Sequence, residues 1–408
     1  MSVADRPGAR EDRIVALDVL RGVAVGGILL ANAFVFFGLL FDPDGHLKQL
    51  PTAQIDHAVE FLEHVVVEGK FYSIFSLLFG IGFGLQLSRR GDVAIGRFRR
   101  RLMVLVGIGF VHAVLIWAGD ILLLYALLGF SMPWFARRTD RSLLRWTAGL
   151  LATPTVLYTV GLVAWMAFGP GPSGEAVPAG PAQEIPPEIL ARINAVGTGG
   201  VGDALIGNLI FLVGRWADLF VTVRFPKVLG MFVLGLWVVR QGIAADPAAH
   251  RALLRKWRAL GLGFGLPLNL AGAWALSVWP YLPPSPGALL GVACQAVGFP
   301  LLALGYASTI VLSVVDGRGA LAAFAPVGRM ALSNYLTHSI VCVTLSYGFG
   351  FGLWGRIGAM QAWGVAILIV LLQIPFSRWW LSSHRYGPME WVWRRLTYGQ
   401  PLAMRAPS

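Results

Sequence analysis

The chain has 408 residues, of which 56% are hydrophobic and only 13% are charged, and its mean hydropathy is +0.67. So little charge excludes a soluble globular protein of this length, and we expect one membrane domain over residues 1–408. The net charge of +12 does not indicate nucleic-acid binding, because most basic residues lie in short segments between apolar runs.

Apolar runs of roughly 17–25 residues recur along the chain, and each can cross a hydrocarbon core of about 30 Å. The polar start lacks a convincing cleavage site, so we interpret the first run as a span. We predict an all-α polytopic bundle of about ten transmembrane spans, within a range of nine to eleven. The predicted spans are 14–40, 71–88, 102–118, 121–136, 146–168, 227–241, 259–278, 288–314, 320–346 and 360–380.

The distribution of basic residues predicts the topology. If the N-terminus is inside, most of the 33 basic residues fall on the inner side, as the positive-inside rule requires. We therefore predict a multi-pass protein of the bacterial cell membrane with both termini cytoplasmic. Residues 41–70 and 169–203 then form extracytoplasmic loops, and residues 382–408 form a cytoplasmic tail.

Residues 204–223 are apolar enough to span the membrane but contain Arg215 and Asp218. A crossing here would place the basic stretch 240–258 outside. We therefore interpret this segment as a helix that lies at or dips into the outer interface. The alternative is a true span in which Arg215 and Asp218 pair.

The loop 41–70 is rich in aspartate, glutamate and histidine, a composition that could suggest a metal site. It lacks a tight ligand spacing such as HExxH, so we favour a solvated, partly helical loop and expect no metal. Cys294 and Cys342 both lie in apolar runs, which gives no indication of a disulfide.

Two polar positions in the first span are candidates for function. Asp18 and Arg21 are three residues apart, so they share a helix face and can pair. This pair either orients the first helix or leaves Arg21 to meet an anionic cofactor from the cytoplasm. Asn32 lies deeper in the same span, where it can bond between helices or contact a substrate.

The second span begins at Gly69-Lys70 and contains several glycines, which we expect to allow close helix packing. Lys70 is one of the few basic residues on the predicted outer side. It is a candidate for holding an anionic substrate group, although snorkelling to the interface is an equal alternative.

The strongest candidate for chemistry is His112, which lies within an apolar run and is followed by Asp120. An ionisable residue inside a span is costly, and a histidine near a carboxylate suits proton transfer. Eight residues correspond to about 12 Å along a helix. We therefore expect His112 and Asp120 to face one cavity without forming a direct bond. Tyr125 is close enough to line the same cavity as a substrate contact. A direct bond would require the chain to fold back after Trp117. The alternative for His112 is an interhelical hydrogen bond.

The ninth predicted span is unusually polar. Arg329, Asn334 and His338 could line a polar cavity, and we take Arg329 and Asn334 as candidate substrate contacts. Their alternative role is to hold helices together. In the tail, Pro388 predicts the start of a short helix whose tryptophans and arginines suit an anchor on the inner membrane surface.

Five stretches together resemble the bacterial YeiB family: LDVLRGVAVGGILLANA, GKFYSIFSLLFG, HAVLIWAGDILLLYALLG, GRMALSNYL and RYGPMEWVWRRLTYG. The resemblance covers nearly the whole chain, in the family's order, and implies a C-terminal domain of unknown function. His338 departs from the family, whose members often have glutamine there. The family is grouped with membrane acyltransferases, which pass an acyl group from cytoplasmic acyl-CoA to an acceptor, usually a sugar, by means of an embedded histidine.

The resemblance implies an acyltransferase in which His112 is the general base and Asp120 orients it. Acyl-CoA would be the donor, with its phosphates held by inner arginines: Arg21, Arg97, Arg99, Arg100 and Arg101. The alternatives are a transporter for a small anionic or lipid-linked metabolite, with His112 and Asp120 as a proton relay, and a scaffold without catalysis. We expect membrane lipids and a small-molecule substrate as partners, no nucleic acid, and allow for a homodimer.

Overall fold

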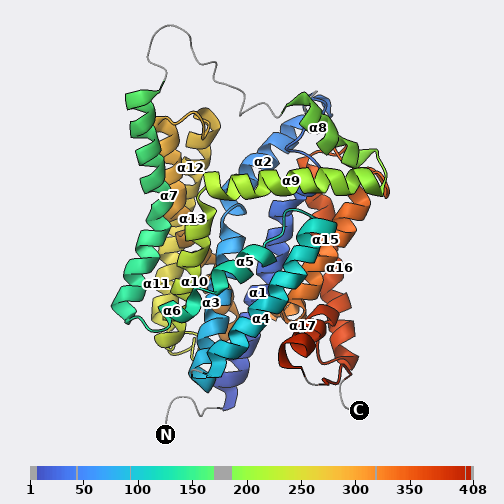
Figure 1. The fold of residues 1–408 in the computed structure, drawn as a ribbon. Coiled ribbons are helices and arrows are strands. Elements are labelled where there is room, and N and C mark those ends of the chain that lie inside the picture. The colour runs from blue at the N-terminus through green and yellow to red at the C-terminus, as the bar shows by residue number, and fades with distance from the viewer. Residues whose placement is uncertain are drawn as a thin grey trace.

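The computed structural model describes residues 7–42, 45–91, 93–169, 186–317, 319–399 and 401–405. Most of their long helices run side by side in one bundle, and the start of α1 and the end of α17 lie at the same end of it (Figure 1). Within the described ranges the only strand-like contact is an isolated bridge between His384 and Arg405. The prediction of an all-α membrane bundle is confirmed.

The helices of the N-terminal half are α1 (Pro7–Phe36), α2 (Ala53–Val66), α3 (Lys70–Arg90), α4 (Val93–Leu115), α5 (Leu122–Gly129), α6 (Met132–Phe135) and α7 (Asp140–Phe168). The C-terminal half contains α8 (Pro187–Asn194), α9 (Val201–Val221), α10 (Arg224–Arg240), α11 (Arg251–Leu260), α12 (Leu266–Val278), α13 (Pro286–Val315), α14 (Ala325–Arg329), α15 (Ala331–Ser346), α16 (Ala359–Ser383) and α17 (Pro388–Tyr398). A π-helical turn, Gly261–Gly265, joins α11 to α12 without a break. In the described part of the chain, seven helical stretches are long and apolar enough to cross a membrane.

Two of the predicted spans are not continuous helices in the structure. Residues 121–136 divide into α5 and α6, which have only eight and four residues. At about 1.5 Å per residue, neither crosses a bilayer alone. Residues 320–346 are interrupted at Met330, where α14 ends and α15 begins.

Helix α2 occupies much of the predicted loop 41–70, which is therefore largely helical. In the second predicted loop, residues 170–185 lie outside the described residues. The tail contains α17, which begins at Pro388 as predicted.

Helix α9 crosses the bundle instead of running along it (Figure 1). This orientation agrees with the interpretation of residues 204–223 as a horizontal helix, although α9 is long and apolar enough to span. Its inward face carries Ala204, Asn208 and Leu219, which are buried, and Arg215, which is half-buried. The helix therefore places an amide and a guanidinium group against the bundle interior.

The close helix packing predicted for the second span occurs between α3 and α10. A Cβ atom at Gly80 would collide with the carbonyl oxygen of Phe232, and one at Gly235 would collide with that of Leu77. Small residues let two backbones approach within the membrane, where van der Waals contact drives association. The two glycines thus fix the position of α3, which forms a wall of both cavities described below.

Candidate functional site

The candidate site is built around the break between α4 and α5. Helix α4 ends at Leu115, and the chain turns back before α5 begins at Leu122. Asn208 of α9 satisfies the exposed backbone: its amide nitrogen donates to the carbonyls of Ala113 and Val114 at 2.9 Å, and its oxygen accepts from the amide of Ala118 at 2.7 Å. Irregular backbone at membrane depth needs such internal partners.

Because the chain turns back here, His112 and Asp120 meet directly. The Nδ1 atom of His112 lies 2.7 Å from Oδ2 of Asp120, and both side chains are buried. The expectation that they share a cavity without bonding is therefore wrong. The spacing estimate assumed a continuous helix, whereas the turn after Trp117 removes most of the separation. The second oxygen of Asp120 accepts from the amide of Leu123 at 2.7 Å and so caps α5.

The third member of this hydrogen-bonded chain is Ser339 of α15, which sequence analysis missed. Its Oγ lies 2.8 Å from Nε2 of His112, and it is 1% exposed. An ionised Asp120 only accepts, so a neutral His112 carries its proton on Nδ1 and accepts from the Ser339 hydroxyl at Nε2. A carboxylate, an imidazole and a hydroxyl in this order form a proton-accepting unit. No spacing rule links residues 227 positions apart.

Tyr335 connects this unit to a cavity. Tyr335 lies one turn before Ser339 on α15, its ring centroid is 5.4 Å from that of His112, and its hydroxyl accepts from the amide of Ile121. Tyr335 also lines a cavity of about 280 Å³, which we call the inner cavity, between α1, α3, α4, α5, α15 and α17. His112 itself does not line the cavity, whereas Tyr335 both lines it and packs against the His112 ring.

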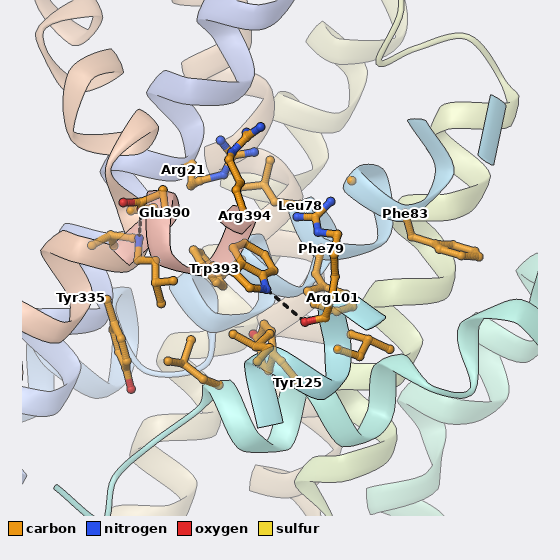
Figure 2. A pocket seen from close by; sticks show the side chains of 18 of the residues that line it. Arg21, Leu78, Phe79, Phe83, Arg101, Tyr125, Tyr335, Glu390, Trp393 and Arg394 are labelled. Atoms are coloured by element: carbon orange, nitrogen blue, oxygen red, sulfur yellow. Dashed lines mark hydrogen bonds between the residues drawn. The ribbon is translucent and has the colours of Figure 1, made fainter. Parts of the chain in front are cut away.

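The inner cavity is polar at one end and apolar at the other. Figure 2 shows Arg21, Arg101 and Arg394 on one side of the cavity and the phenol of Tyr335 on another. Phenylalanines of α3 and α4 also line the cavity, including Phe75, Phe79, Phe83 and Phe98. Arginines beside an apolar channel suit a ligand that joins a phosphate group to an apolar chain.

The structure separates the predicted basic cluster. Of the four neighbouring arginines on α4, only Arg101 lines the inner cavity, whereas Arg97, Arg99 and Arg100 are exposed and lie outside it. Arg21 also lines the cavity and is bonded to Asp18 at 2.8 Å, so the predicted pairing is present, while contact of Arg21 with an anionic cofactor stays a prediction. Arg329 joins them from α14.

The tail helix α17 forms a wall of the inner cavity. The indole of Trp393 donates to the carbonyl of Arg101 at 3.0 Å, and the Arg101 guanidinium lies 4.5 Å from its ring (Figure 2). Glu390 accepts from the amides of Leu332 and Ser333 and thereby caps α15. The helix predicted as a surface anchor is therefore joined to the catalytic candidate through α15.

The remaining candidate residues either have side chains that are bonded elsewhere or lie outside the inner cavity. Tyr125 lines the inner cavity, but its hydroxyl donates to the carbonyl of Tyr72 at 2.7 Å. Asn334 is buried and donates to Val327 and to Ser377 of α16, which is the helix-joining alternative. Asn32 is half-buried on α1 and does not line the cavity. Lys70 is fully buried and is the first residue of α3, at the end of this helix that does not line the inner cavity.

A second cavity, which we call the outer cavity, has a volume of about 500 Å³ and lies between α2, α3, α10, α12 and α13. Tyr72 lines it, and the carbonyl of the same residue accepts from Tyr125 of the inner cavity. One turn of α3 therefore separates the two cavities.

Three potential metal ligands adjoin the outer cavity, in the loop where no metal was expected. Ligand atoms of Glu63, His64 and Glu68 lie within 4.8 Å of one another. His64 is already bonded to Glu68 at 2.8 Å, and the ammonium of Lys70 donates to the His64 carbonyl. The ammonium of Lys70 is a cation beside Glu63 and Glu68, so it competes with a metal ion for these two carboxylates.

Comparison of the sequence with known proteins finds relatives that are themselves described as uncharacterised. Residues 238–400 match a family described as a protein of unknown function, DUF418. The chain is 31% identical to the uncharacterised protein YeiB of Escherichia coli (strain K12), over 95% of this chain and 96% of the relative. It is 30% identical to the uncharacterised protein YxaH of Bacillus subtilis (strain 168), over 98% of each chain. No solved structure matches it.

Proposed function

Because the chain belongs to the YeiB family of membrane proteins, whose compared relatives have no assigned activity, we propose a function from the site itself: a membrane-embedded acyltransferase. It moves an acyl group from cytoplasmic acyl-CoA to an extracytoplasmic acceptor such as a sugar. The observation that carries this proposal is the hydrogen-bonded series Asp120, His112 and Ser339 behind the Tyr335 wall of a cavity with arginines at its other end.

The proposed reaction needs one base. His112 Nε2 accepts the proton of the acceptor hydroxyl while that oxygen attacks the thioester carbonyl carbon. The carbon–sulfur bond then breaks, the CoA sulfur leaves as thiolate, and the imidazolium returns the proton to it. Asp120 holds the imidazole by Nδ1 and stabilises its charged form. Ser339 occupies the hydroxyl position that the acceptor would take, and Tyr335 must turn aside to join the inner cavity to His112.

The donor would enter from the end of the bundle where α1 begins. Arg21, Arg101, Arg329 and Arg394 supply the charge that CoA phosphates require, and the aromatic lining suits the acyl and pantetheine portions. We further propose that this end faces the bacterial cytoplasm, since the arginine-rich segments gather there.

A transporter for a small anionic or lipid-linked metabolite is the second candidate. It is favoured by the position of the two cavities on either side of one turn of α3, marked by Tyr72. His112 and Asp120 would then relay protons. Counterflow of a solute in proteoliposomes, without a covalent product, would support this candidate.

The decisive experiment measures thiol release from acetyl-CoA and longer acyl-CoAs by the purified protein. We expect the wild type to release CoA thiol and His112→Ala to lose at least about a hundredfold in rate, since general-base catalysis contributes about 10²–10⁴-fold. His250→Ala is the matched control, because among the described residues the His250 side chain bonds to the Asp246 carbonyl, in a turn that lines neither cavity. Release that is equal in wild type and His112→Ala would disprove the assignment.

A second experiment tests the donor site on α17. Arg394 lines the inner cavity, whereas the adjacent Arg395 does not and packs over Trp391. Loss of one charge-assisted bond corresponds to about 1.5–3 kcal/mol, so Arg394→Gln should raise the KM for acyl-CoA about tenfold or more with little change in kcat. Arg395→Gln should leave both constants unchanged. Equal effects of the two variants would exclude a specific role for this side of the cavity.

A further inference from the structure

The turn that joins α9 to α10 has a strained backbone. Val223 adopts a left-handed conformation with φ of 49°, and it is the only non-glycine residue with a positive φ in the described chain. A β-branched side chain disfavours this region, so the surrounding contacts must hold it there. The hydroxyl of Tyr281 donates to the carbonyl of Val221, and that of Thr222 donates to the carbonyl of Asp218. The turn directs Arg224 and Lys227 to the wall of the outer cavity.

The cations at this turn have more hydrogen-bond donors than the protein satisfies. Asp218 is shared by Arg215 at 2.9 Å and Arg224 at 3.7 Å. The Nε atoms of both arginines are buried without a hydrogen-bond partner. Across the described residues, Lys227 has no carboxylate within 4.0 Å, and its ammonium lies 6.0 Å from the Phe299 ring centroid. The two buried Nε atoms require an acceptor, and the half-buried Lys227 adds a positive charge beside them.

The rest of the outer cavity is suited to a polar molecule that carries hydroxyl groups. Its walls include the aromatic rings of Phe61, Tyr72, Tyr281 and Phe299. Two carboxylates also face it: Glu68, which is bonded to His64, and Glu60, which is nearly half exposed. These carboxylates lie on the α2 side, whereas Arg224 and Lys227 project from the α10 side. Glu68 is close enough to interact electrostatically with both cations. The lining therefore offers cations for an oxyanion and, beside them, carboxylates that can accept hydrogen bonds from hydroxyl groups.

We propose that the outer cavity binds a small polyol bearing a phosphate or carboxylate group, with the oxyanion on Arg224 and Lys227. If the proposed acyl transfer holds, this molecule is the acceptor, bound one turn of α3 away from the donor cavity, and it must move inward before its hydroxyl reaches His112. The role of this molecule as acceptor rests on the proposed function, whereas the binding of its oxyanion to Arg224 and Lys227 is independent of that function.

The test is isothermal titration of the detergent-purified full chain with glucose 1-phosphate, glucuronate, inorganic phosphate and uncharged glucose. We expect glucose 1-phosphate or glucuronate to bind the wild type more tightly than glucose does. Arg224→Gln and Lys227→Gln should each raise the Kd about tenfold or more, as loss of a charge-assisted bond predicts. Arg224→Lys should recover part of the affinity, which separates lost charge from lost folding.

The controls distinguish failure of this proposal from failure of the proposed function. Arg192→Gln removes an exposed charge on α8, outside the cavity, and should leave the Kd unchanged. His112→Ala should bind with wild-type affinity even where it abolishes thiol release. The proposal is overturned if no soluble oxyanion binds the wild type, or if Arg224→Gln and Arg192→Gln behave alike. It is also overturned if only phosphatidylglycerol nanodiscs show Arg224-dependent binding, since the ligand is then a lipid headgroup.

Discussion

At the scale of single residues, the proton on His112 is placed by its neighbour. Asp120 accepts at Nδ1, so Nε2 faces Ser339 as an acceptor. The same Asp120 side chain caps α5 through Leu123, which links its structural and proposed chemical roles. An asparagine at this position preserves the shape but can donate from its amide to Nδ1, which would move the imidazole proton to Nε2.

We therefore expect Asp120→Asn to lower kcat for acyl transfer by about 10³-fold or more, as the wrong tautomer does in serine hydrolases, with the KM for acyl-CoA little changed. Ser339→Ala should retain most activity, because the acceptor hydroxyl replaces the serine in the proposed reaction. Steady-state kinetics with several acyl-CoA concentrations measures both constants. An unchanged kcat in Asp120→Asn, or complete loss in Ser339→Ala, would contradict these roles.

At the scale of elements, α9 supports the site although it contributes no proposed catalytic residue. Asn208 satisfies two carbonyl groups and one amide at the break after α4. A buried backbone group that loses its partner costs about 1–3 kcal/mol. Because the position of His112 depends on this break, α9, which lies across the bundle, helps to hold the candidate site in place.

Replacing this amide should destabilise the protein. We expect Asn208→Ala to lower the free energy of unfolding by about 2–4 kcal/mol, since up to three buried groups lose a partner. Thermal unfolding in detergent should show a clear decrease in Tm. Asn32→Ala is the comparison, because Asn32 is half-buried on α1 and makes no side-chain hydrogen bond in the described structure. Similar losses in both variants would refute the role of Asn208 as the partner of the break.

At the scale of the whole molecule, two cavities approach one turn of α3 from opposite ends of the bundle. Residues from the beginning and end of the chain, Arg21 and Arg394, line the same inner cavity (Figure 2). The outer cavity is assembled from helices on the other side of Tyr72. This arrangement brings a donor and an acceptor toward each other only if the two ends of the bundle face opposite sides of a membrane.

Cysteine labelling tests that orientation directly. Both native cysteines, Cys294 and Cys342, are buried, so the wild type should give little background. We expect a membrane-impermeant maleimide to label Arg192→Cys on α8 in intact spheroplasts, and to label Arg99→Cys on α4 only after permeabilisation. Labelling of Arg99→Cys in intact spheroplasts would reverse the proposed topology and place the arginines of the inner cavity outside.

Local composition was enough to predict the class of the molecule, an all-α membrane bundle. Long apolar runs and clustered arginines fix a membrane bundle, because each depends on local composition. His112 and Asp120 were identifiable because an ionisable residue in apolar sequence is costly wherever the helix lies. That the two residues bond was visible only in the fold, because the bond depends on a turn whose backbone groups are satisfied by Asn208, 96 positions after His112. Ser339, the wall formed by α17 and the strained turn at Val223 were likewise inaccessible, because each arises from contacts between segments that no local pattern connects.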